Sequence, residues 1–208
     1  MKKFVLLAGV ATLALAACNK EENTPAAVDK AQDAVGAAVG QVAAGGLGND
    51  TAGMYVPNAA MGDMYEIMAA DIAIQRSKNP QVLELARMIK ADHTAASNMM
   101  KQSAPQAAPD VQLPTSLDQR RQGLIDNLRS APAEAFDETY IDQQIAAHQE
   151  AITLHRGFSD NEGPAALVQH ATQVLPKIEA HLRQAQQIDG ALGSGGAAAS
   201  GGAPAKKQ

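Results

Sequence analysis

Apolar residues recur at intervals of three, four and seven along two long segments, and this spacing constrains the fold more than any other feature. The segments cover about residues 81–102 and 164–188. Their apolar positions are Val82, Leu85, Ala86, Ile89, Ala96 and Met100 in the first, and Leu167, Ala171, Val174, Ile178, Leu182 and Ala185 in the second. This period places the side chains on one face of an α-helix. No segment shows the alternating pattern of a strand, so we expect an all-α protein.

The core available to these helices consists of small and aliphatic side chains. The chain has no Trp, three Phe and three Tyr, and abundant Ala favours closely packed helices over a β-sandwich. Pro and Gly residues divide the chain into segments that we interpret as four long helices, at about 57–77, 81–102, 133–158 and 164–188. A shorter helix at about 116–129 has Ser116 as its candidate N-cap. The predicted fold is an up-down four-helix bundle with a short extra helix between the second and third long helices.

The N-terminal segment has the features of a secretion signal. Lys2 and Lys3 precede an apolar run that is too short to span a bilayer, and the run ends in Leu15-Ala16-Ala17-Cys18. This sequence resembles a bacterial lipobox. The resemblance implies removal of residues 1–17 and acylation, including palmitate, of Cys18; the alternative is an ordinary signal peptide with a buried Cys. Asn19 in place of Asp favours the outer membrane, facing the periplasm.

The composition of the remaining segments predicts their organisation. Residues 18–56 and 190–208 are rich in Ala, Gly and small polar residues, which predicts a flexible tether and a disordered tail around a bundle domain at 57–189. The formal net charge is −5 and basic residues do not cluster, which argues against a nucleic-acid partner. The membrane, reached through lipidated Cys18, is the predicted partner. Because this Cys is the only one, disulfides and zinc–cysteine sites are excluded.

Three histidines occupy apolar-face positions on three different helices: His93, His148 and His181. Glu66 lies on a stripe of small residues in the first long helix. Counting residues from the helix ends places Glu66, His93 and His181 at one level of an up-down-up-down bundle, with His148 higher by roughly 9 Å at 1.5 Å per residue. We therefore expect Glu66, His93 and His181 to converge, with His148 or Tyr140 beside them. This prediction requires that the short helix turn the chain without crossing the bundle; a crossing would leave His181 remote from the others.

Two interpretations of these polar residues stay open. One Glu and three His could ligate a single transition-metal ion, Zn²⁺, Cu²⁺ or Fe²⁺. Alternatively, each His is a hydrogen-bonded core residue, paired with Asp92, Asp137 or Tyr140, and the protein has a structural or interaction role. No His is preceded three residues earlier by Glu, which argues against a di-iron oxidase and against catalysis of that type. His155 and His170, near the last turn, are expected to be solvent-exposed.

The chain resembles the bacterial domain-of-unknown-function family 4142. The resemblance rests on Asp92-His93, on Phe136-Asp137-x-x-Tyr140 and on Leu175-Pro176-x-x-x-x-His181, together with Glu66 and His148. It covers about residues 57–189 and implies a ferritin-like bundle exported to the cell envelope. It implies no biochemical activity, because none is associated with the family's name.

Overall fold

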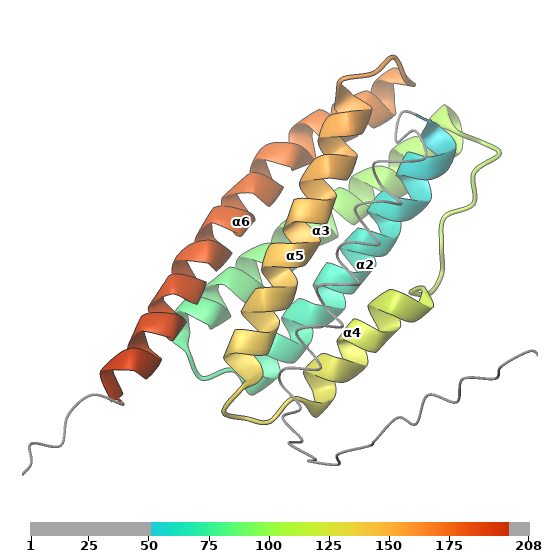
Figure 1. Cartoon of the computed structure of the whole chain (residues 1–208). Helices are drawn as coiled ribbons and strands as arrows, with labels where there is room; N and C mark the ends of the chain where they lie inside the picture. The colour runs from blue at the N-terminus through green and yellow to red at the C-terminus, as the bar shows by residue number, and fades with distance from the viewer. Residues whose placement is uncertain (1–50, 200–208) are drawn as a thin grey trace, which may run out of the picture.

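The computed structural model describes residues 51–199, and five α-helices form most of this part of the chain (Figure 1). They are α2 (Ala52–Arg76), α3 (Pro80–Ala107), α4 (Gln119–Ser130), α5 (Phe136–Ser159) and α6 (Ala165–Ala199). Within residues 51–199 there is no strand. The predicted all-α fold, with four long helices and one short helix between the second and third, is therefore confirmed. The predicted signal peptide, Cys18 and most of the tether lie outside the described residues.

The four long helices form a ring in which every neighbouring pair is antiparallel. Around the ring the order is α2, α3, α6 and α5, and each contacts its two neighbours. At one end of the bundle the C-terminal half of α2 packs with the N-terminal halves of α3 and α5 and with the C-terminal part of α6. The opposite halves of the same helices pack together at the other end. Thus α3 and α5 run in one direction, and α2 and α6 in the other (Figure 1).

The connection between α3 and α5 crosses the length of the bundle, which corrects the predicted topology. An extended segment leaves the end of α3, and α4 then returns the chain to the end where α3 began (Figure 1). The Arg76 guanidinium at the end of α2 donates hydrogen bonds to the carbonyls of Leu128, Arg129 and Ala131 at the end of α4. It also lies 4.5 Å from the centroid of the Phe136 ring at the start of α5. These contacts hold the end of α4 and the start of α5 against the end of α2.

Several helix ends also differ from the sequence-based prediction. Helix α2 begins five residues earlier, at Ala52, and α3 continues to Ala107. Pro57 and Pro105 therefore lie inside helices, within two turns of a terminus, and each removes one backbone hydrogen bond. Helix α4 is capped by Asp118, which accepts from the Arg121 backbone N–H, rather than by Ser116.

The last helix also ends later than the sequence-based prediction. Helix α6 extends to Ala199, so the predicted tail from residue 190 is helical over its first ten residues. Among the residues that the structure describes, no helix is long and apolar enough to cross a membrane.

The core is divided into apolar clusters along the bundle axis. One cluster, at the end of the bundle where α3 and α5 begin, includes Leu85, Ile89 and Ile141. The cluster at the opposite end includes Met100 and Phe158. A smaller middle cluster consists of Ala96, Val174 and Ile178. Because the polar residues described next lie between the end clusters, they are shielded from water on both sides.

Candidate metal centre

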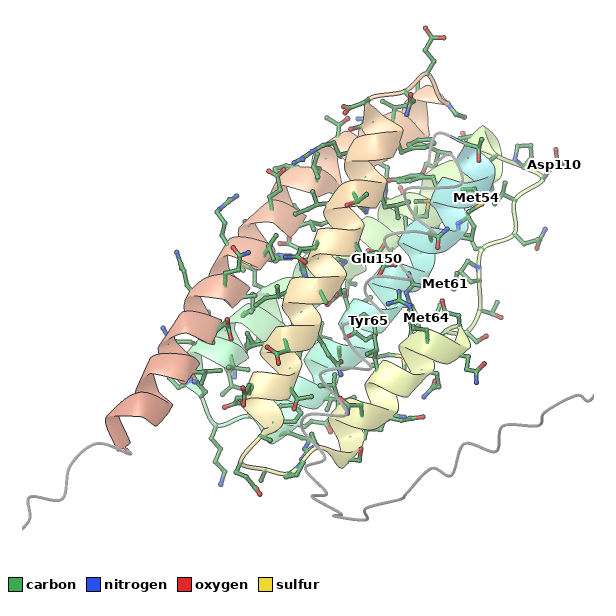
Figure 2. The ribbon with its side chains drawn as sticks, viewed as in Figure 1. Met54, Met61, Met64, Tyr65, Asp110 and Glu150 are labelled. Atoms are coloured by element: carbon green, nitrogen blue, oxygen red, sulfur yellow. The ribbon has the colours of Figure 1, made fainter. Side chains whose placement is uncertain are left out.

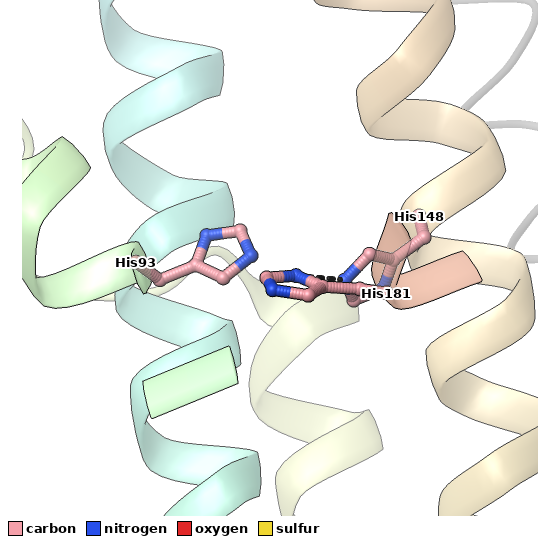
Figure 3. A group of neighbouring side chains, drawn as sticks. All are labelled: His93, His148 and His181. Carbon is pink, nitrogen blue, oxygen red and sulfur yellow. Dashed lines mark hydrogen bonds between the residues drawn. The ribbon is translucent and has the colours of Figure 1, made fainter. Parts of the chain in front are cut away.

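Helices α3, α5 and α6 bring His93, His148 and His181 together in the bundle interior (Figure 3). Each side chain is at most 5% exposed. The ring centroids are 5.7 Å apart for His93–His148 and for His93–His181, and 5.3 Å apart for His148–His181. One nitrogen from each ring lies within 4.8 Å of the other two. Of the residues expected to converge, His93 and His181 meet, and His148, expected beside them, completes one compact group.

The remaining nitrogen of each ring is held by a hydrogen-bond acceptor outside the group. His93 Nδ1 lies 2.8 Å from Asp63 Oδ1, and His148 Nδ1 lies 2.8 Å from the Gln144 carbonyl oxygen. His181 Nε2 lies 3.0 Å from Asp92 Oδ2. Carboxylate and carbonyl oxygens only accept, so these three outer nitrogens carry the N–H. This pairing is the arrangement that fixes metal-ligating histidines in proteins.

Two of the inner nitrogens face each other at hydrogen-bond distance, marked by the dashed line in Figure 3. His148 Nε2 and His181 Nδ1 are 3.2 Å apart. Burial and the nearby His93 lower the pKa of His148 well below its usual range and lower the pKa of His181 to about 4. Both rings are therefore neutral near pH 7, and two lone pairs point at each other. A cation at this point would convert the repulsion into two ligand bonds.

The third inner nitrogen, His93 Nε2, is buried and has no hydrogen-bond partner in the described structure. Burial lowers the pKa of His93, but the hydrogen bond and charge of Asp63 outweigh burial, and the pKa is raised overall. Zn–N bonds of about 2.0–2.1 Å imply nitrogens about 3.3 Å apart around a tetrahedral ion. The His148–His181 spacing matches this value, and no pair exceeds 4.8 Å. These spacings are compatible with a single ion.

Glu66 lies beside the histidines rather than among their inner nitrogens. Its Oε1 is 3.7 Å from His148 Nδ1, the outer nitrogen, and its Oε2 is buried without a hydrogen-bond partner. Burial raises its pKa to about 7, although the charge of His93 acts in the opposite direction. The structure therefore places Glu66 next to the predicted site and outside the three-nitrogen group.

Of the three predicted supporting residues, one contacts the histidines and two do not. Asp92 holds His181 and also accepts from Lys177 Nζ at 2.5 Å; these interactions outweigh its partial burial and lower its pKa. Tyr140 is fully buried in the apolar cluster at the end where α3 and α5 begin. Burial, with the charge of Glu66, raises the pKa of Tyr140. Asp137 is at the first turn of α5. No hydrogen bond or ion pair joins either residue to the three histidines in the described structure.

The sequence interpretation missed Asp63, which is 4% exposed and holds His93. Its position was detectable, because Ala59, Asp63, Glu66 and Ala70 follow one another at intervals of four, three and four. This spacing defines one face of α2, and all four residues are buried.

His155 and His170 are buried rather than solvent-exposed, contrary to the prediction. Both contact the Tyr55 hydroxyl, which lies 3.1 Å from His155 Nδ1 and 2.6 Å from His170 Nδ1. His170 Nε2 lies 3.1 Å from the Ala96 carbonyl oxygen. The Tyr55 ring stacks on Phe158, with centroids 4.0 Å apart. The start of α2, absent from the predicted helix, supplies the aromatic residue that buries them.

A family model described as "Domain of unknown function (DUF4142)" matches residues 37–188. The chain belongs to this family. The match confirms the resemblance drawn from the sequence and extends it toward the N-terminus. No curated protein sequence matches the chain.

The chain is similar in fold to solved structures of two helical proteins. One belongs to another domain of unknown function, and the other is CopM with copper bound. A DUF305 fragment from Deinococcus radiodurans is 14% identical with a TM-score of 0.57, covering 65% of this chain and 93% of its own. CopM in the Cu(I)-bound form is 22% identical with a TM-score of 0.57, covering 66% and 94%. The Cu(II)-bound form is 22% identical with a TM-score of 0.58, covering 67% and 95%. At these identities the similarity concerns the fold.

Proposed function

We propose that this domain binds one transition-metal ion through His93 Nε2, His148 Nε2 and His181 Nδ1. The observation that carries the proposal is the pairing of every outer nitrogen with an oxygen acceptor while the inner nitrogens converge within 4.8 Å. A purely structural histidine would use its second nitrogen to satisfy another core group. Here the inner nitrogens of His148 and His181 face each other at 3.2 Å, a spacing that suits two ligands of one cation.

Copper and zinc are the ions that the donor set fits best. Neutral imidazole suits Cu²⁺, Zn²⁺ and Fe²⁺, and affinity for a nitrogen site rises toward Cu²⁺ among the divalent ions. Two structures of similar fold carry copper in their descriptions, which supports copper as the first ion to test. Three protein ligands leave a position for a fourth group, such as water.

The surroundings favour retention of an ion over turnover of a substrate. The three histidines lie between apolar clusters at the two ends of the bundle, and their outer hydrogen bonds fix the ring orientations before an ion arrives. We therefore propose a metal-holding or buffering role in the cell envelope. In this proposal lipidated Cys18 anchors the chain to the outer membrane on the periplasmic side, and the tether holds the bundle away from the lipid surface. The support for anchoring is the Leu15-Ala16-Ala17-Cys18 sequence.

Calorimetric titration of the purified protein with Cu²⁺ and with Zn²⁺ tests the binding site. Wild type should take up one ion per chain, and His93→Ala should abolish binding. His155→Phe is the matched control, because it replaces a buried histidine outside the group. Circular dichroism should show that both variants remain helical. Absence of binding by wild type, or equal loss in both variants, contradicts the proposal and favours a structural polar network.

A further inference from the structure

A cavity lies beside the histidines, between α2, α4 and α5, and its volume is about 50 Å³. A water molecule needs at least about 10–15 Å³ of such space, so the cavity has room for water. Tyr65 of α2 and Glu150 of α5, both labelled in Figure 2, belong to its wall. The wall also includes His93, whereas His148 and His181 do not line the cavity. The cavity therefore reaches the metal centre from the α4 side.

The charged side chains that line this cavity differ in how much of their surface is exposed to solvent. The most exposed charged side chains of its wall are Arg120 and Glu150, at 28% and 15%. At the buried limit, the side chains of Asp63, Glu66 and His93 are 4–5% exposed. The outer limit is thus formed by α4 and α5, and the inner limit by the acidic face of α2 and by His93.

Ion pairs close the outer limit. Glu150 accepts from Arg120 Nη2 at 2.8 and 2.9 Å and from Arg121 Nη2 at 3.2 Å. Arg121 also donates to the side chain of Asp118, the N-cap of α4. The Glu150 pairs join the start of α4 to the middle of α5, and Glu150 and both arginines line the cavity. They are partly exposed, so exchange with water is cheap compared with a fully buried pair.

At the inner limit, two carboxylate oxygens are positioned to receive a cation. Asp63 Oδ2 and Glu66 Oε2 are both buried and lack a hydrogen-bond partner in the described structure. A cavity of this size is too small for an ion with its full hydration shell. Carboxylate oxygens that replace part of the lost water lower the cost of that dehydration.

We propose that this cavity is the path by which the metal ion reaches His93 and leaves it, with the Glu150 ion pairs closing its outer end. The inference rests on the proposed function. An ion enters where α4 and α5 separate, exchanges water for the free oxygens of Asp63 and Glu66, and passes to His93 Nε2. The path controls the rates of uptake and release, while the three histidines set the equilibrium affinity.

Gly62 offers a direct way to block this path. It lines the cavity, and a Cβ added there meets nothing within 4 Å, so a larger side chain enters the open space. Gly123 is the matched control. It lies on α4, is exposed, and also has nothing within 4 Å of an added Cβ. A Gly→Leu change at either position raises helix propensity similarly, but only the change at position 62 fills the cavity.

Stopped-flow uptake of Cu²⁺ tests the proposal, with quenching of tyrosine fluorescence as the signal, since the chain has three Tyr and no Trp. Release is followed after addition of EDTA. Gly62→Leu should slow both uptake and release by about tenfold, equivalent to about 1.4 kcal/mol in the barrier, and leave Kd unchanged. Gly123→Leu should match wild type. Glu150→Gln, which removes the ion pairs, should speed both steps.

The outcomes separate the two proposals. If wild type takes up Cu²⁺ but neither Gly62→Leu nor Glu150→Gln changes the rates, the ion uses another path and this inference is wrong. A weaker Kd in Gly62→Leu with an unchanged uptake rate also overturns it, because the residue would then act on the site. If wild type takes up no Cu²⁺, the metal centre itself is wrong.

Discussion

His148 and His181 turn unprotonated nitrogens toward each other across 3.2 Å, while the opposite side of each ring donates to an oxygen. In an apolar interior two facing lone pairs repel each other more strongly than in water, because the local dielectric is low. Neither ring can turn over without losing its outer hydrogen bond. The pair is therefore arranged at some cost to the metal-free fold, which a bound cation recovers.

Replacing both residues, as His148→Leu/His181→Leu, should remove the repulsion together with the site. We expect the double variant to unfold in EDTA at a temperature no lower than wild type. Wild type should gain about 2.7 kcal/mol in Cu²⁺ at a hundred times its Kd, and the variant should gain nothing. Differential scanning calorimetry with and without Cu²⁺ measures both quantities. A clearly destabilised variant in EDTA would support a scaffold role for the histidines.

Metal uptake near neutral pH should release about one proton from the histidines, not three. The lowered pKa values of His148 and His181 mean that both are already deprotonated, whereas Asp63 raises the pKa of His93. Affinity should therefore fall as pH drops through the pKa of His93. The pKa of Glu66 is raised to about 7, so Glu66 also titrates near neutral pH and the count is made in a Glu66→Gln background. Calorimetry in buffers of different ionisation enthalpy gives the number, and a count of two or three protons contradicts the assignment.

Glu66→Gln should stabilise the metal-free fold at alkaline pH. The folded pKa of about 7 lies above the ordinary value of 4.5, so the neutral form is favoured by folding. Below the ordinary pKa the carboxyl is neutral in both states and costs nothing. As pH rises to 8, ionisation of wild type costs about 3 kcal/mol, which the amide avoids.

Urea unfolding in EDTA at pH 5 and pH 8 measures this difference. Glu84→Gln, an exposed site on α3, is the control and should show no such dependence. A Glu66→Gln advantage that is the same at both pH values would contradict the assigned pKa.

Asp63→Asn should weaken metal binding by about 10–100-fold, the usual effect of losing the partner that orients a ligating histidine. The loss of charge also lowers the pKa of His93, so the pH dependence of binding should shift downward in the same variant. A purely structural role would not produce that shift. Asp71→Asn on the same helix is the control, because the Asp71 side chain is 43% exposed and pairs with Lys90. Calorimetric Cu²⁺ titrations at several pH values check both effects.

Cys18→Ala should release the protein from membranes or leave the signal unprocessed. The reason is that Leu15-Ala16-Ala17-Cys18 is expected to direct acylation, and several acyl chains on one residue provide stable anchoring. Radiolabelled palmitate followed by membrane fractionation tests the prediction. If wild type incorporates no label, the lipoprotein interpretation is wrong.

Periodicity alone determined that the chain is helical, which faces are apolar, and that His93, His148 and His181 point inward. These properties are local, because a 3.6-residue repeat fixes which side chains share a face. The same repeat contained Asp63, whose partnership with His93 was overlooked because one face of α2 seemed to consist of small residues. The role of Tyr55 was hidden in another way, since Pro57 was interpreted as the start of the helix.

Tertiary structure alone decided the levels at which these faces meet. The crossing connection was expected to separate His181 from His93, yet the two meet. Helices α2 and α3 extend five residues further at one end than Pro57 and Gln102 suggested. His93 lies thirteen residues after Pro80 and His148 twelve residues after Phe136, in two helices that start at the same end. Relative height depends on where helices end and which ends adjoin, and both are set by packing between distant segments, which no local pattern encodes.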